Sequence, residues 1–359
     1  MHCILFKKLG SSFPLLMPAN DSTLRVYGNW IFTPFILPFA PPLSRSEGCL
    51  LRNCFLKALK SILRNDELAA EYVLLSCMSH VYGHRHGAAP LGYLSTNIRG
   101  IDTSAESDAM VSSIIEIVSS VVPLAESIDV SKRSDLHAEY DENRGTLSIS
   151  PLQLAEGTVL CVDERRLTDI RNLSQSHKKS LSTLDSVIEK LTLPLIASYY
   201  SVDLPLDIST LIFSQAESIF HPQLVCPWEP QEASGLELQS SLSDFQNSLS
   251  LIRLWWSYTR LRNVVMSAAA ITVAENDFVN LRQVDSRLTL EDFHTWLCVA
   301  RLIAISYGDS EITPEHWNLM RSMERKRLNR LVPIPETTRL NDPTSIFQRA
   351  SPNTVAAGL

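Results

Sequence analysis

The sequence lacks the cysteine spacing that binds metals. No two of its seven cysteines form the C-x-x-C pattern typical of zinc and iron–sulfur sites, so we expect no metal site. An odd, scattered set of cysteines also gives no disulfide framework, which favours a reducing compartment. The seven positions are Cys3, Cys49, Cys54, Cys77, Cys161, Cys226 and Cys298.

A glycine-rich phosphate loop is also absent. The pattern G-x-x-x-x-G-K-[S/T] neutralises nucleotide phosphates with backbone amides and a lysine, and no stretch of the sequence matches it. The pattern G-x-S-x-G, which marks the nucleophile of α/β-hydrolases, is missing too. The sequence therefore offers no anchor for hydrolase chemistry, and we expect no cofactor.

Long apolar runs and excess positive charge are missing as well. The longest apolar stretch, residues 30–43, contains four prolines and is shorter than the roughly 20 residues that span a bilayer, so we expect no membrane helix. The first 20 residues match a signal peptide poorly, because Lys7 and Lys8 interrupt their apolar run. The net charge of -7 provides no global attraction for nucleic acid, and direct binding would need a local basic patch.

Helices and strands alternate in the first half of the chain. Apolar residues recur at helical spacing in three segments, and three short β-prone runs lie between or after them. We expect residues 131–144, which are polar and charged, to form an exposed loop. The predicted helices are 67–82, 104–122 and 178–191, and the predicted strands are 91–98, 158–162 and 209–214.

Helices dominate from about residue 244. A helix at 244–265 contains the pair Trp255 and Trp256, which we interpret as helix core rather than a stacking surface for bases. A second helix, 290–306, begins after Thr289 and ends at Gly308, and a third runs from Thr313 to about residue 331. The predicted order is an irregular extension (1–47), an α/β domain (48–240), an all-helical domain (241–331) and a disordered tail (332–359).

The strand at 158–162 ends on two acids, Asp163 and Glu164. An apolar strand followed by Asp-Glu is typical of the Walker B element, where Asp helps to hold magnesium and Glu polarises water. Without a phosphate loop, we favour a structural or vestigial role for both residues. The alternative is an active ATPase with an atypical phosphate loop, in which both acids would be catalytic.

Two further clusters have simpler interpretations than a binding site. His84 and His86 lie two residues apart with no third metal ligand nearby, which favours a solvated loop. The second cluster is a basic run in the last predicted helix, which we interpret as a solvated helix end; an acidic partner surface and a nuclear import signal stay open as alternatives. The run comprises Arg321, Arg325, Lys326, Arg327 and Arg330.

Several separated segments, in order, resemble the mini-chromosome maintenance (MCM) complex-binding protein family. The resemblance covers about residues 50–331, and the N-terminal part of the family is not matched by residues 1–47. The segments that carry it are LAAEYVLLSCMSHVYGHRHGAAPLGYLSTNI (68–98), SPLQLAEGTVLCVDE (150–164), DLPLDISTLIFSQAES (203–218), FVNLRQ (278–283) and EDFHTWLCVARLIAISYGDSEITPEHWNLMRSMERKRLNRL (291–331).

The resemblance implies both a fold and a function. The fold would be a degenerate AAA+ or MCM-like α/β domain, with vestigial Walker B residues at Asp163 and Glu164, followed by a lid-like helical domain. The function would be noncatalytic binding to MCM helicase subunits in the nucleus, in assembly or unloading of the MCM complex during DNA replication and in sister-chromatid cohesion. Contact with chromatin would then be indirect, through those subunits.

Overall fold

A computed structural model gives the fold of the chain. It describes residues 44–83, 90–141, 145–147, 150–167, 172–196, 201–231, 235–260, 262–284 and 288–331. The helices are α4 (Arg45–Ile62), α5 (Glu67–Met78), α6 (Ala105–Val121), α7 (Gln175–Lys190), α8 (Gly235–Arg260), α9 (Ala268–Val284), α10 (Leu290–Tyr307) and α11 (Pro314–Arg330). The strands are β1 (Ser95–Arg99), β2 (Ala125–Asp129), β3 (Ala138–Asp141), β4 (Thr146–Leu147), β5 (Thr158–Asp163), β6 (Thr192–Ile196), β7 (Ser201–Pro205), β8 (Ile208–Ser214), β9 (Leu224–Pro227), β10 (Val265–Met266) and β11 (Glu311–Ile312).

A parallel sheet of five strands forms the centre of the molecule, in the order β2-β5-β8-β1-β9. Its middle strands are covered on both faces, which explains their almost continuous apolar sequence. Every residue of β8 is buried, as are the first five of β5. The α/β fold class expected from the sequence is therefore confirmed.

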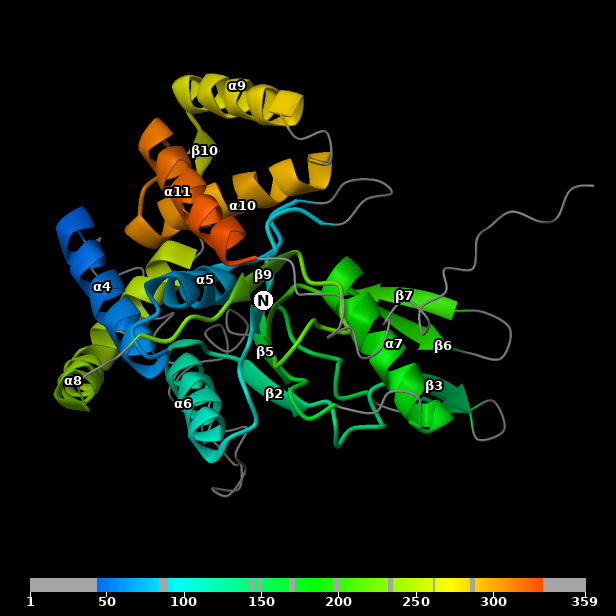
Figure 1. Ribbon diagram of the computed structural model, residues 1–359. Coiled ribbons are helices and arrows are strands. Elements are labelled where there is room, and N and C mark those ends of the chain that lie inside the picture. Colours follow the sequence, from blue (N-terminus) through cyan, green and yellow to red (C-terminus); the bar gives the residue numbers. More distant parts are fainter. Residues whose placement is uncertain are drawn as a thin grey trace, which may run out of the picture.

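Alternate residues of the central strands contribute to two different cores. Val159 and Cys161 face a core built with α4, α5, α6, α8 and α10, whereas Leu160 and Val162 face a core built with α7. Figure 1 shows this layering, with α4, α5, α6 and α8 on one side of the sheet and α7 on the other. The period of two along each strand thus joins both layers to the sheet.

A second sheet, β4-β3-β6-β7, lies beside α7 (Figure 1). Residues 132–135 are exposed, as expected for the stretch 131–144, but the expectation of a loop is wrong for residues 138–141, which form β3. Leu136 and Ala138 are fully buried, and β3 pairs with β6. Polar residues surround these two apolar ones, so the sequence shows no alternating pattern that would predict the strand.

Two of the largest buried aromatic residues lie in α8, which packs against α4. Trp255 and Trp256 are 0% and 1% exposed, and Phe55 stacks on Phe245 with ring centroids 6.0 Å apart. The interpretation of the two tryptophans as helix core is therefore confirmed. α4 begins at Arg45, after a capping box made by Ser44 and Glu47, which is inside the stretch predicted to be an irregular extension.

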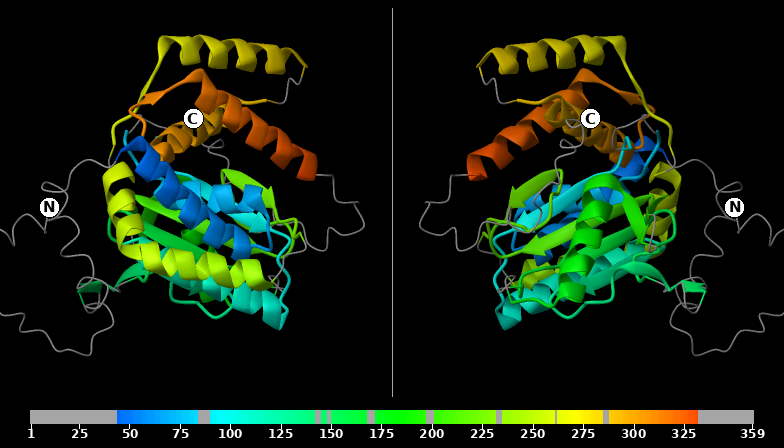
Figure 2. Two further views of the ribbon diagram at one scale, coloured as in Figure 1. Left: turned by 90° about the vertical axis from the view of Figure 1, so that its left-hand side faces the viewer. Right: turned by 90° about the vertical axis from the view of Figure 1, so that its right-hand side faces the viewer.

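The helices α9, α10 and α11 form a group at one end of the molecule (Figure 2). The predicted start and end of α10 are confirmed, because Thr289 caps its N-terminus and Gly308 ends it with a φ of 75°. The two-residue strands β10 and β11 pair in this part, where we expected no strand. α8 crosses the domain boundary predicted at residue 240, and the division into domains stays a prediction.

Within the described residues, no helix is both long and apolar enough to cross a bilayer.

The predicted helix 67–82 ends earlier, at Met78, and the predicted strand 91–98 begins later, at Ser95. The predicted helix 178–191 starts three residues earlier, at Gln175, because Ser174 provides its N-cap.

Asp66 connects the last helix, α11, to the N-terminus of α5. It is fully buried, caps α5 through the amide of Ala69, and accepts a hydrogen bond at 2.8 Å from Nη1 of Arg330. The substitution Asp66→Ala removes the cap and leaves Arg330 without its buried partner. We expect urea unfolding to show a loss of about 3 kcal/mol in the free energy of unfolding.

The neighbouring acid Glu67 provides the control. Its side chain is 66% exposed and lies 3.9 Å from Lys60, so Glu67→Ala should change the same free energy by less than about 1 kcal/mol. Equal losses in the two variants would show that the buried ion pair of Asp66 contributes no more to the free energy of unfolding than the exposed pair of Glu67.

Candidate functional site at the carboxyl edge of the sheet

The strand order places a topological switch point between β1 and β8. The connection after β1 runs through α6 to β2, whereas the connection after β8 runs past β1 to β9. Two adjacent strands whose connections leave in opposite directions open a crevice at their carboxyl ends, where α/β proteins bind ligands. The carboxyl end of β5, with Asp163 and Glu164, lies on the other side of β8.

The loop after β1 is held tightly against β8. The amides of Gly100 and Ile101 both donate to the carbonyl of Ser214, at 2.9 and 3.0 Å. The hydroxyl of Ser214 donates in turn to Oδ1 of Asn97, at 3.0 Å. The loop then enters α6, so it has the strand–loop–helix position that a phosphate loop has in nucleotide-binding proteins.

An acid of the chain itself occupies the N-terminus of α6. Oδ1 of Asp102 accepts hydrogen bonds from the hydroxyls of Ser104, at 2.8 Å, and Ser107. The bonds from Ser107 and Ser104 hold the pKa of Asp102 below its ordinary value. A helix N-terminus favours anions, and the carboxylate of Asp102 lies at this one.

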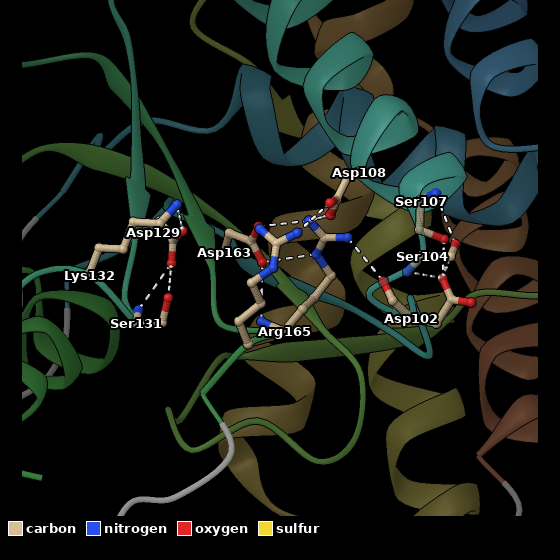
Figure 3. Close-up of polar contacts among 10 residues, drawn as sticks. Asp102, Ser104, Ser107, Asp108, Asp129, Ser131, Lys132, Asp163 and Arg165 are labelled. Carbon is tan, nitrogen blue, oxygen red and sulfur yellow. Dashed lines mark hydrogen bonds and ion pairs between the residues drawn. The ribbon is translucent and has the colours of Figure 1, made fainter.

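Arg165 connects this loop to the end of β5 (Figure 3). Its side chain is 2% exposed and binds Asp163 with two parallel bonds, Nε to Oδ1 at 2.9 Å and Nη2 to Oδ2 at 2.7 Å. Nη1 donates to the carbonyl of Asp102 at 3.0 Å, and Nη2 lies 3.0 Å from Oδ1 of Asp108. Burial disfavours the charged guanidinium, but the carboxylates outweigh it and raise the pKa of Arg165.

Glu164 does not share the ion pair of Asp163 with Arg165. It is 6% exposed, and its Oε2 accepts a hydrogen bond from the amide of Ile219 at 3.4 Å. Burial raises the pKa of Glu164 to about 8, although hydrogen bonds from Ser218 and Ile219 oppose the shift. At neutral pH the protonated form of this carboxyl is therefore favoured.

The sequence correctly indicates a strand that delivers Asp163 and Glu164 to the carboxyl edge of a parallel sheet. In the structure Asp163 pairs with Arg165, whereas Glu164 accepts a hydrogen bond from the amide of Ile219. The two acids therefore do not form a pair of free carboxylates. That both acids are vestigial Walker B residues stays a prediction.

Sequence reasoning missed Arg165 and Asp102. Arg165 directly follows the two acids, and Asp102 precedes a Thr-Ser pair at a helix start, so both signals are present in the sequence. Neither could be interpreted without knowing that β1 and β5 flank the same strand.

The other candidate clusters have mixed outcomes. His84 and His86 lie outside the described residues. In the part of the chain that the structure describes, no three His, Cys, Asp or Glu side chains are grouped to hold a metal ion.

The sequence suggested that the basic run of α11 is a solvated helix end, but the structure shows that only part of the run is solvated. Three of its members form ion pairs at 2.7–2.8 Å, in the pairs Arg321–Asp277, Arg327–Glu324 and Arg330–Asp66. Arg325 and Lys326 remain exposed to solvent.

These features define an α/β protein with a parallel central sheet, at whose carboxyl edge Arg165 joins the end of β5 to the loop after β1 and to α6. The sequence matches the model of a family described as mini-chromosome maintenance replisome factor over residues 1–331, and the chain belongs to that family. The match begins at residue 1, so it extends further towards the N-terminus than the resemblance that starts near residue 50.

Relatives from plants and vertebrates are named mini-chromosome maintenance complex-binding protein. The chain is 28% identical over 287 residues to the one from Arabidopsis thaliana, covering 78% of this chain and 47% of the relative. It is 27% identical over 308 residues to that of Salmo salar (82% and 49%) and 27% identical over 347 residues to that of Gallus gallus (92% and 51%). The chain thus spans about half the length of these curated relatives.

The ion pairs of Arg165 predict a large effect of removing its charge. The substitution Arg165→Met leaves Asp163 and Asp108 without their buried partner, so we expect the free energy of unfolding to fall by about 3 kcal/mol in urea. Arg166→Met is the control, because Arg166 also binds Asp108 but is 41% exposed, and it should cost less than about 1 kcal/mol. Equal effects would contradict the central role of Arg165.

The raised pKa of Glu164 predicts a pH dependence with a definite sign. Between the ordinary pKa of a glutamate and about 8, the folded state binds a proton that the unfolded state has lost, so stability falls as pH rises. The slope approaches about 1.4 kcal/mol per pH unit. Glu164→Gln removes this term and should gain stability relative to wild type from pH 5 to pH 8, in urea unfolding at each pH. A difference that does not change with pH would refute the shift.

Proposed function

We propose that this chain is a noncatalytic protein that binds MCM helicase subunits. The observation that carries the proposal is the network of Arg165, Asp102 and Asp163, which occupies the place where a nucleotide-binding α/β protein holds phosphate. The names of the relatives support the choice of partner, since they are called complex-binding proteins rather than enzymes.

We also propose that the fold is a degenerate AAA+ or MCM-like domain with a lid-like helical part. The parallel sheet, with an acid-terminated β5 near the switch point, supports the first half of this proposal. The helices α9, α10 and α11, grouped beyond the sheet, support the second half. An MCM-like surface could occupy a place that a true helicase subunit would take.

The proposed cellular role is in DNA replication and the cell division cycle. It comprises assembly or unloading of the MCM complex and a connected role in sister-chromatid cohesion, in the nucleus. The sequence resemblance and the family description support this role. The net charge of -7 supports contact with chromatin through MCM subunits rather than by direct nucleic-acid binding.

An active ATPase is not favoured by any feature of the described site. The N-terminus of α6 carries Asp102, Glu106 and Asp108, whose charges oppose a phosphate group. Loss of the lysine and amide cradle removes several kcal/mol of transition-state stabilisation.

Size-exclusion chromatography of the purified chain with MCM subunits tests the proposal. We expect coelution with and without ATP. On this proposal the chain binds no nucleotide at the switch point, so ATP does not control its binding to MCM subunits. Phosphate release in the same fractions should equal that of the MCM subunits alone and should not change in Glu164→Gln. Absence of coelution would contradict the proposed partner, and release that Glu164→Gln abolishes would make the chain an enzyme.

A further inference from the structure

A groove of about 300 Å³ lies between α9, α10 and α11, far along the chain from the switch point. Trp317 and Met320 form part of its floor and are 0% and 1% exposed, whereas Leu328 is 51% exposed. Figures 1 and 2 show these three helices at the outer end of the molecule, with α9 outermost. The apolar lining consists of Leu281, Leu288, Trp296, Trp317, Met320 and Leu328.

Each of the three helices also carries a large apolar side chain that is more than half exposed. These are Val279 on α9 at 53%, Leu290 on α10 at 58% and Leu328 on α11 at 51%. Of these three, Leu328 lines the groove itself, and an exposed apolar side chain at an apolar groove marks a surface that another molecule covers.

The charges that line the groove leave a positive excess. Arg321 is neutralised by Asp277 at 2.7 Å, and Glu324 is neutralised by Arg327 at 2.7 Å. Arg325 also lines the groove and has no ion pair among the described residues. The one charge of the groove lining without an ion pair among the described residues is therefore positive, and it favours an acidic partner by electrostatic complementarity.

The chain's own C-terminal segment fits this charge poorly. Residues 332–359 follow directly after α11, but their two acids, Glu336 and Asp342, are balanced by Arg339 and Arg349. The segment therefore has no net negative charge to offer the groove.

We propose that the groove between α9, α10 and α11 binds an acidic amphipathic helix of the protein's MCM partner. Apolar side chains at positions i, i+3 or i+4, and i+7 of that helix would enter the groove over Trp317 and Met320, and its acidic side chains would face Arg325. This inference rests on the proposed function, and it assigns the surface through which that function is carried out.

Two substitutions on the groove and two matched controls test the inference in the full chain. Leu328→Asp places a charge on the apolar rim, and its control Leu251→Asp changes a residue on α8 that is 54% exposed. Arg325→Glu reverses the charge of the rim, and its control Lys326→Glu makes the same change one residue along α11, outside the groove lining. The measurement is the Kd for purified MCM subunits, after circular dichroism has established that all four variants are folded.

The inference predicts that Leu328→Asp and Arg325→Glu each weaken binding by about tenfold, while the two controls stay within about twofold of wild type. It also predicts a weaker salt dependence of Kd in Arg325→Glu than in wild type, because one rim charge no longer attracts the partner.

The failures of the two proposals are distinguishable. If wild type binds MCM subunits and all four variants bind equally well, the groove is not the docking surface, although the proposed function stands. If wild type binds no MCM subunit, both proposals fail. If light scattering finds a dimer of the chain alone that Leu328→Asp dissociates, the groove holds a second copy and the inference is overturned.

Discussion

The buried guanidinium of Arg165 is the interaction on which the central part of this structure depends. It joins the end of β5, through Asp163, to the loop after β1, through the carbonyl of Asp102, and to α6, through Asp108. Loss of the arginine would leave both carboxylates without their buried partner, which is costly. The four groups therefore form one unit at the carboxyl edge of the sheet.

This closed edge contrasts with the open end of the molecule. At the sheet, acids and arginines neutralise one another and leave little for a ligand to bind. At α9, α10 and α11, apolar side chains and Arg325 face solvent around a groove. The groove thus lies apart from the carboxyl edge of the sheet, and we propose that it is the surface that binds another protein.

Local signals allowed much of the fold to be predicted. The strand before Asp163 and the cap and stop of α10 at Thr289 and Gly308 each depend on a few neighbouring residues, and the structure has them where the sequence indicates. Features that depend on distant segments could not be predicted. β3 has too few apolar residues to show a period, and the partners of Arg165 become evident only when the strand order is known.

The central proposal is that Arg165 and its partners, rather than a nucleotide, take up the carboxyl edge of the sheet. Titration of the full chain with a fluorescent ATP analogue and magnesium, followed by polarisation, tests it most directly. The account predicts no saturable binding below about 1 mM nucleotide. Saturable binding with a Kd of about 10 μM that Asp163→Asn abolishes would contradict it, because Asp163 would then hold magnesium instead of Arg165.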